Sequence, residues 1–287
     1  MLTRKKITGS YITVSVILSL CTLIILYPFI YILAVSLSDS VSVMQNDVWL
    51  WPIGFNLDAY KKVASVNNFL NSYKNTFLYT LVGTAIALVV TTLTAYPLSK
   101  SYLKGRRFFN LMIVFTMMLS GGLVAGYLNV KELGIMNSIW AIVLPGCCSA
   151  YNMILMRTFF EQLPISMEES AKLDGASDMA ILLKIILPLS TPIISTMVLF
   201  YAVGRWNSWF TEFIYLRDAD KFPLQLIIRS VVLAGEMDMA AQGSSEIVTA
   251  TSLKYSVVIV SMIPMLILYP LIQKYLVKGI MIGAVKG

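Results

Sequence analysis

The sequence predicts an all-α integral membrane protein with six transmembrane helices. Of its 287 residues, 57% are hydrophobic and only 13% are charged, and the mean hydropathy is +0.76. A soluble domain of this length carries roughly twice that charged fraction, so most of the chain has to face lipid or other apolar helices. Six apolar segments approach the roughly 20 residues that cross a bilayer core. They are 11–37, 76–98, 108–128, 138–156, 187–203 and 255–275.

The first segment, 11–37, is interpreted as a retained helix. It is too long for a signal peptide, and no small-residue cleavage site follows it. A bulky Leu20 precedes Cys21, which argues against a lipoprotein cleavage site. The fifth segment, 187–203, is the weakest, because it begins near Pro188 and Pro192. The six segments contain no Asp, Glu, Lys or Arg apart from Lys274 at the end of the last one.

Prolines and glycines interrupt most of these segments. Membrane helices tolerate them as kinks or close helix contacts when neighbouring groups satisfy the freed backbone. For Pro145-Gly146 a role in a transport pathway is an alternative that the sequence leaves open. The positions concerned are Pro28, Gly83, Gly121-Gly122, Pro145-Gly146, Pro264 and Pro270.

The formal charge of +7 would suit a nucleic-acid partner, but basic residues that flank membrane spans produce the same excess. With six spans, three basic segments fall on one side, which the positive-inside rule makes cytoplasmic. Residues 1–10 and the tail 276–287 are therefore expected inside the cell, together with the loop 161–187. The basic residues are Arg4, Lys5, Lys6, Lys100, Lys104, Arg106, Arg107, Lys274, Lys278 and Lys286.

The residue types also limit the chemistry. The chain has no histidine, and its three cysteines show no C-x-x-C spacing, so neither a metal site nor a disulfide framework is expected. A G-x-x-x-x-G-K-[ST] phosphate loop is missing as well. We therefore expect that this chain does not bind or hydrolyse ATP and that it binds no cofactor.

The loop from Pro164 to Pro188 carries the most information. Ser166 and Glu169 match a capping box that would begin a short helix. Gly175 can take a positive φ and end that helix, and Ser177 can cap a second one. In this first helix, Ile165, Met167, Ala171 and Leu173 are expected to make apolar contacts, and Glu168, Lys172 and Asp174 to stay in water.

An amphipathic helix lying on the membrane surface is the plain alternative for this loop. Such helices usually have a basic polar face, whereas this one is acidic. The composition therefore favours a protein partner.

The spacing of the loop resembles the "EAA" loop of permease subunits in binding-protein-dependent ABC importers. Glu169-Ser170-Ala171 is followed four residues later by Gly175, then by Ile185 and by Leu187-Pro188. Ser170 stands where the family has Ala, a small-for-small change. The fuller form 169–177 is similar to the maltose-type sugar permeases. The resemblance implies that the ATPase-coupling residues are Glu168, Glu169, Ser170, Ala171, Asp174, Gly175, Ala176, Leu187 and Pro188.

The resemblance covers most of 71–287 and looks nearest the oligosaccharide and polysaccharide permeases of Gram-positive bacteria. It implies a type I ABC importer permease fold over 71–275, with five helices and a cytoplasmic coupling helix in the loop 161–187. Further similar stretches are 75–76, 133–138, 144–145, 204–209 and 283–287.

By the same resemblance, the chain would import a sugar, an oligosaccharide, across the cell membrane. Its partners would be a second homologous permease in a heterodimer, two ATPase subunits that bind ATP and magnesium, and an extracytoplasmic sugar-binding lipoprotein. The main alternative is an ion-coupled secondary transporter, which usually carries an ionisable residue within its spans. The charge-free span interiors disfavour it. A membrane assembly protein would not require a loop with this spacing.

A substrate pathway is expected near Trp206, Asn207 and Trp209, because aromatic faces and amide groups bind sugars. An interfacial aromatic belt explains the same residues equally well. The outer loop 218–254 would contact the binding protein, or serve only as a connector.

Overall fold

The computed structural model describes residues 9–65, 68–119, 121–241 and 244–284, and among these residues the regular elements are all helices. The chain divides into two compact units. Unit 1 comprises Met1–Phe69 and Ile228–Ile263, and unit 2 comprises Leu70–Ile227 and Pro264–Gly287. Two helices, α14 (Leu224–Ala241) and α15 (Ser244–Ala284), have residues in both units.

Unit 1 begins with α1 (Gly9–Ser36), whose described side chains are apolar and exposed around the helix over most of its length. A helix that is apolar on every face suits a lipid environment. A small core forms where α1 ends, with Val35 and Val48 buried against Tyr31 and Tyr255. The remaining helices of this part are α2 (Ser40–Met44) and α3 (Asp58–Ser65).

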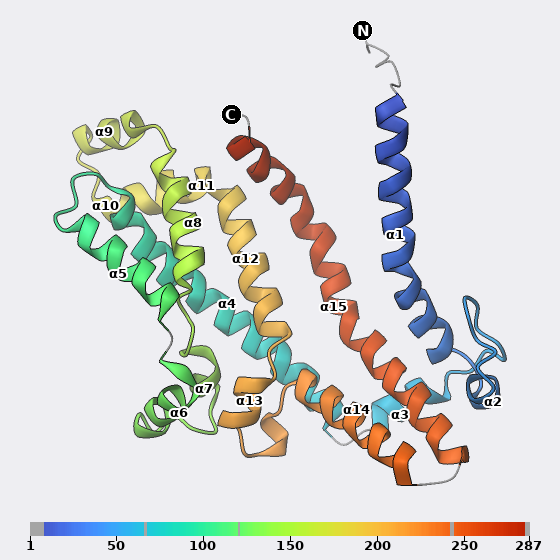
Figure 1. The fold of residues 1–287 in the computed structure, drawn as a ribbon. Helices are drawn as coiled ribbons and strands as arrows, with labels where there is room; N and C mark the ends of the chain where they lie inside the picture. The colour runs from blue at the N-terminus through green and yellow to red at the C-terminus, as the bar shows by residue number, and fades with distance from the viewer. Residues whose placement is uncertain (1–8, 66–67, 120, 242–243, 285–287) are drawn as a thin grey trace. The chain divides into compact units, whose positions relative to one another are not determined.

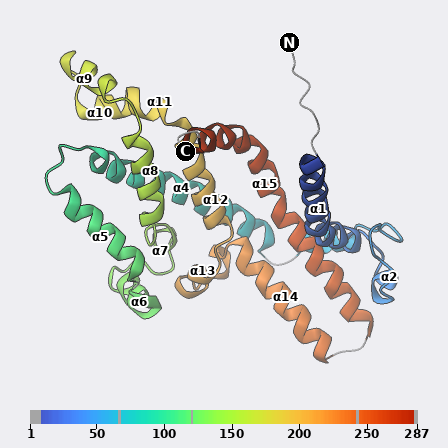
Figure 2. The same cartoon turned by 45° about the horizontal axis from the view of Figure 1, so that its top comes forward.

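Unit 2 is built along α4 (Phe69–Ser99), a helix of 31 residues. At 1.5 Å per residue it is about 46 Å long, more than a bilayer core requires. Figures 1 and 2 show α9, α10 and α11 at one end of this unit, and α6, α7 and α13 at the other. The helices that follow α4 are α5 (Arg106–Met118), α6 (Gly122–Glu132), α7 (Ile139–Val143), α8 (Ala150–Glu161), α9 (Ile165–Leu173), α10 (Asp178–Ile181), the π-helix η1 (Leu182–Ile186), α11 (Leu187–Leu189), α12 (Thr191–Trp206), α13 (Phe210–Tyr215) and the short 3₁₀ helix η2 (Ala219–Lys221).

The main core of unit 2 lies between the C-terminal half of α4, α8, α12 and the α10–η1 segment. Its buried side chains include Ala95, Met153, Phe160, Ile181 and Met197. Because α10 and η1 contribute Ile181, Leu182 and Ile186 to this core, they pack directly on the helices of the bundle.

The structure supports the predicted all-helical membrane fold in its coarse form. Among the described residues, three helices are long and apolar enough to cross a membrane: Ile12–Ser36, Phe69–Ser99 and Thr251–Pro270. Counting each of two bent helix pairs as one span raises the number to five. The count of six, and the domain limits 71–275, therefore stay predictions.

The predicted span 138–156 is not one continuous helix. It divides into α7 and α8, with a break over 144–149. Pro145 lacks the N–H that a helix needs, and Gly146 takes a φ of +68°, in the left-handed region. The hydropathy of this segment was therefore a correct guide to apolar character but not to helix continuity.

Candidate functional site

Helix α9 begins two residues earlier than a capping box at Ser166 predicts, so that prediction is wrong. The N-cap residue is Pro164, in an extended conformation, and no side chain caps the helix. Proline has a fixed φ and no N–H, which suits the residue that precedes a helix. Ser166 and Glu169 consequently lie inside α9 with exposed side chains.

The turn after α9 agrees with the prediction for Gly175. The N–H of Gly175 donates to the carbonyl of Lys172 (3.0 Å), and the N–H of Ala176 donates to the carbonyl of Ala171 (2.9 Å). These two bonds define a Schellman motif, which requires a left-handed residue after the helix. Gly175 supplies it with a φ of +79°, and a Cβ there would meet no atom within 4 Å. Ala171 and Ala176 pack together against the core.

The predicted cap of the second helix is confirmed. The hydroxyl of Ser177 accepts a hydrogen bond from the N–H of Ala180 (3.3 Å) at the start of α10. The chain then continues through η1 into α11, where Leu187 is half-buried and Pro188 is exposed. At Ser190 the direction changes by 84° into α12. The loop thus forms two short helices joined at a glycine elbow.

The side-chain orientation of α9 agrees with the prediction at Ala171, Lys172 and Asp174, but it is reversed at four other residues. Glu168, expected in water, is only 6% exposed. Leu173, expected in apolar contact, is 89% exposed, and Ile165 and Met167 are exposed too. The three large apolar side chains of α9 therefore face outward from unit 2, together with the exposed Glu169, Ser170 and Asp174 of the predicted site, whereas Ala171 packs on the core.

Burial of Glu168 has a specific cause. Its carboxylate forms an ion pair with Lys100, which directly follows α4 and is itself 8% exposed. The Lys100 ammonium also lies 4.4 Å from the ring centroid of Tyr96, one turn earlier in α4. A buried carboxylate needs such a counter-ion, so the partner from the neighbouring loop decides which face of α9 turns inward.

Lys172 makes a second contact between α9 and the α4–α5 loop. Its ammonium donates to the hydroxyl of Tyr102 (3.1 Å) and pairs with Asp178 of α10 (3.1 Å). The hydrogen bond to Tyr102, followed by the one to Asp178, raises the pKa of Lys172 above its ordinary value. The protonated lysine therefore bridges α9, α10 and residues 100–105.

At the other end of unit 2, the three predicted pathway residues lie in different environments. Trp206 is 2% exposed and packs edge-to-face on Tyr73, with 5.9 Å between ring centroids. Trp209 is half-buried and contacts Phe210 (5.3 Å). Asn207 alone is exposed, and its amide donates to the Val203 carbonyl (2.9 Å). The structure does not gather the three around one space.

Arg205 closes the break between α7 and α8. Its guanidinium donates to the carbonyls of Ile142, Val143 (2.9 Å) and Pro145 (3.3 Å). These carbonyls lie where the helix ends and would otherwise need other donors. A Cβ on Gly83 would come within 3.1 Å of the Arg205 Nε, which explains a glycine at this position of α4.

A cleft of about 340 Å³ opens beside Arg205. Hydroxyl groups of Ser149, Ser208 and Thr211 and the buried amide of Asn152 line it. Asn152 was missed from the sequence, because an asparagine inside an apolar run carries no signal of its surroundings.

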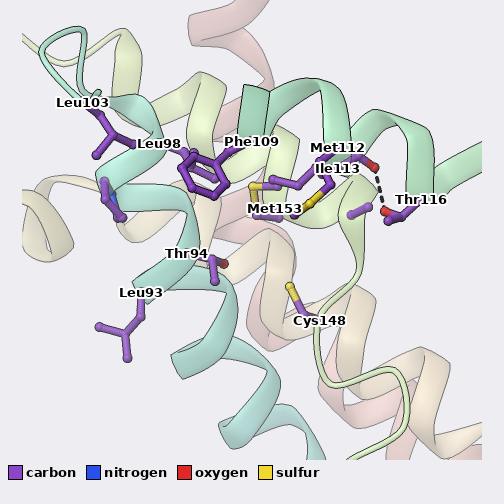
Figure 3. Close-up of a pocket in the computed structure, with 12 residues that line it drawn as sticks. Leu93, Thr94, Leu98, Leu103, Phe109, Met112, Ile113, Thr116, Cys148 and Met153 are labelled. Atoms are coloured by element: carbon purple, nitrogen blue, oxygen red, sulfur yellow. Dashed lines mark hydrogen bonds between the residues drawn. The ribbon is translucent and has the colours of Figure 1, made fainter. Parts of the chain in front are cut away.

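A larger pocket of about 500 Å³ lies between α4, α5 and α8 (Figure 3). Its walls are mainly apolar, with Leu93, Phe109 and Met153 among the lining residues. The hydroxyl of Thr116 donates to the Ile113 carbonyl (2.7 Å), drawn as a dashed line in Figure 3. This pocket offers few partners for sugar hydroxyls, so the smaller polar cleft is the better candidate pathway.

Within the part of the chain that the structure describes, no cluster of His, Cys, Asp or Glu could hold a metal ion.

Comparisons with known proteins extend over nearly the whole chain, although no protein-family model matches it. Protein LplC of Bacillus subtilis (strain 168) is 40% identical over 268 residues, covering 92% of this chain and 90% of LplC. The polygalacturonan/rhamnogalacturonan transport system permease protein YtcP of the same strain is also 40% identical over 268 residues, covering 92% of this chain and 94% of YtcP. Among solved structures, a bacterial ABC transporter involved in the import of the acidic polysaccharide alginate matches with a TM-score of 0.84 and 35% identity, covering 92% of this chain and 95% of that one.

Proposed function

Because the chain belongs to the permease family of carbohydrate ABC importers, we propose that α9, Gly175 and α10 bind a cytoplasmic ATPase and couple its cycle to sugar import. The family resemblance inferred from the sequence is confirmed by the comparisons. The chain is a transporter subunit rather than an enzyme, and ATP hydrolysis in such systems belongs to separate subunits. The comparisons give no support to an ion-coupled secondary transporter.

One observation carries the coupling proposal. Helix α9 buries a charged residue, Glu168, and exposes Leu173 and Ile165. An apolar surface on a short helix outside the membrane spans costs free energy in water unless a partner covers it. The acidic residues Glu169 and Asp174 at its border would supply polar contacts to that partner.

The placement of α9 supports a cytoplasmic location. It lies at the same end of unit 2 as the basic loop that contains Lys100, Lys104 and Arg106, as the contacts to Glu168 and Glu161 demonstrate. The positive-inside rule assigns such a loop to the cytoplasm. On this assignment α6 and α13 lie toward the outside. With the six spans that the sequence predicts, we propose that both termini are cytoplasmic.

We propose the further partners that a permease of this family requires. These are a second homologous permease, a pair of ATPase subunits that bind ATP and magnesium, and an extracytoplasmic sugar-binding protein. The outer end of unit 2, which includes the loop after α13, is the surface proposed for that binding protein.

The proposed cargo is an oligosaccharide. YtcP is a polygalacturonan/rhamnogalacturonan permease by name, and the structural relative takes part in alginate import. Uronate-containing oligosaccharides are therefore the first to test. The cleft beside Arg205 and Asn152 is proposed as part of the pathway, with Asn207 and Trp209 near its outer end and Trp206 as packing support.

The test is purification in a mild detergent or in nanodiscs, with a tag on this chain expressed beside its neighbouring genes. We expect a second permease and an ATPase to co-purify, and ATP hydrolysis to rise when a sugar-loaded binding protein is added. Recovery of this chain without any ATPase, under conditions that keep membrane complexes intact, would overturn the proposed function.

A further inference from the structure

A buried ion pair joins α9 to the end of α4. Lys100 follows the last residue of α4, and Glu168 lies in the first turn of α9, 68 positions later in the chain. The two side chains are 9% and 8% exposed. In five other ion pairs of unit 1 and unit 2, the side chains are exposed by 18% to 77%.

Burial changes what the pair contributes. Exposed pairs are screened by water and contribute little, whereas removal of one partner from a buried pair leaves an uncompensated charge and is strongly unfavourable. Replacement of both partners by apolar residues is often neutral for stability. Stability alone therefore explains a buried ion pair poorly. The pair differs from an apolar contact in that its two charged groups have to stay at a fixed distance and orientation.

The pair lies at the point where α9 and α4 meet. The N–H of Lys100 donates to the carbonyl of Pro97 (3.1 Å), so the backbone at Lys100 continues the last turn of α4. From there α4 runs to Asn75, whose amide donates to the carbonyls of Asp220 (2.7 Å) and Phe222 (3.2 Å) at the opposite end of unit 2. A displacement of α9 that is passed to Lys100 thus reaches the outer end through one continuous helix.

We propose that the Lys100–Glu168 ion pair is the positioning element that transmits movement of α9 to α4 during transport. The inference rests on the proposed function, because that function gives α9 a moving partner, the ATPase. The role is assigned to a contact inside this chain and not to the surface that binds the ATPase. Lys172 and Tyr102 support the same junction, but their contact is partly exposed.

The experiment compares five variants in the complete importer, reconstituted in proteoliposomes with its ATPase and binding protein. Lys100→Met and Glu168→Gln each remove one charge. Lys100→Glu/Glu168→Lys exchanges the charges, and Lys100→Met/Glu168→Met replaces the pair by apolar side chains. Lys61→Met is the matched control, because Lys61 forms an exposed pair with Asp58. Uptake of labelled oligogalacturonides and alginate oligosaccharides is measured against ATP hydrolysed, with thermal unfolding recorded for each complex.

Glu168 is buried beneath the outward face of α9, so it belongs to the junction with α4 and not to the ATPase contact that the family resemblance implied. We expect each single variant to hydrolyse ATP but to transport about tenfold less sugar per ATP, because the remaining charge is left without its partner. The charge exchange should restore most of the wild-type ratio of sugar transported to ATP hydrolysed. The double-methionine variant should regain the thermal stability of the wild type without regaining the ratio, and Lys61→Met should match the wild type throughout.

Two results would overturn the inference while leaving the proposed function intact. One is an unchanged ratio of sugar to ATP in both single variants. The other is full recovery of the ratio in the double-methionine variant, which would make the contact ordinary packing. A wild-type chain that binds no ATPase would instead remove the proposed function, and this inference with it.

Discussion

The side-chain amide of Asn137 donates a hydrogen bond to the carboxylate of Asp218 (2.7 Å), and its oxygen accepts one from the Asp218 N–H (3.2 Å). Asn137 has a φ of +57°, a left-handed conformation that asparagine tolerates better than most residues. This reciprocal contact joins the turn before α7 to the segment after α13. It explains why an asparagine occupies the turn in the stretch 133–138, which the sequence resemblance singled out without a physical reason.

The Asn137–Asp218 contact should make stability depend on pH in acid. Hydrogen bonds from Lys221, and next from Asn137, lower the pKa of Asp218 below its ordinary value. Because the pKa is lowered in the folded state, protonation favours unfolding. The contribution is thus complete above the ordinary carboxyl pKa of about 4 and is lost as the pH falls through the lowered value. Thermal unfolding of Asn137→Ala and wild type should differ at pH 7, and the difference should shrink below pH about 4. In an Asp218→Asn background, which has no charge to titrate, the effect of Asn137→Ala should show no such trend. A difference between wild type and Asn137→Ala that stays constant over this pH range would contradict the assignment.

Substitution of Gly175 should uncouple transport in a graded way. Gly175→Leu adds a strained left-handed residue, which costs about 1–2 kcal/mol, and a side chain that projects into open space where the ATPase is proposed to bind. We expect uptake to fall to background while membrane insertion is retained. Gly175→Asp should act in the same way, with a smaller steric effect.

Gly175→Asn is the matched control, since asparagine accepts the left-handed conformation with little strain. It should retain substantial uptake. Proteoliposome uptake assays decide between the variants, and full transport by Gly175→Leu would remove the elbow from the coupling site.

Leu173 should be the most sensitive apolar residue of the proposed ATPase surface. It is the most exposed of the large apolar residues that the structure describes on α9. Leu173→Glu would put a charge against the partner and is expected to weaken association by about 1–2 kcal/mol. Co-purification of the ATPase at increasing detergent stringency measures this loss.

Leu57→Glu provides the comparison for Leu173→Glu. Leu57 is a partly exposed leucine in the loop that is expected on the opposite side of the membrane. Its substitution should leave ATPase recovery unchanged. Equal losses in the two variants would indicate a general effect of charge insertion rather than a binding surface.

Arg205→Lys should destabilise the chain although the charge is kept. A lysine has a single ammonium and cannot reach three carbonyls with the planar geometry of a guanidinium. Leaving buried carbonyls without donors costs about 1–3 kcal/mol, so the midpoint of thermal unfolding in detergent should fall. Arg217→Lys, at an exposed position, should leave the midpoint within error of the wild type.

Local chemistry was a good guide to the backbone of the candidate site and a poor guide to its side chains. Gly175 and Ser177 were correctly predicted because a helix stop and a cap depend on residues within one turn. The burial of Glu168 was not predicted because its counter-ion lies 68 positions away, and no pattern within the helix reveals it. The absence of a capping box at Ser166 has a local cause, since Pro164 already begins the helix.

For the membrane spans, too, local sequence features were predicted correctly and contacts between distant residues were missed. Hydropathy correctly predicted the long helices α1, α4 and α15, but the apolar helix Leu224–Leu233 lies in the segment 218–254 that was predicted as an outer loop. The sequence showed a possible break at Pro145-Gly146. It did not show that Arg205, from another helix, donates hydrogen bonds to the carbonyls freed by that break. Trp206 was placed near the substrate from its type alone, whereas packing on Tyr73 makes it part of the interior.

The contacts of residues 100–106 also define which segments can be exchanged between permeases. Lys100 binds α9, Tyr102 binds Lys172, and Arg106 binds Glu161 at the end of α8. A chimera that receives only the coupling loop of a relative would replace one member of each of these pairs while keeping the other. The transferable module is therefore discontinuous, and it consists of the α4–α5 loop together with 161–189.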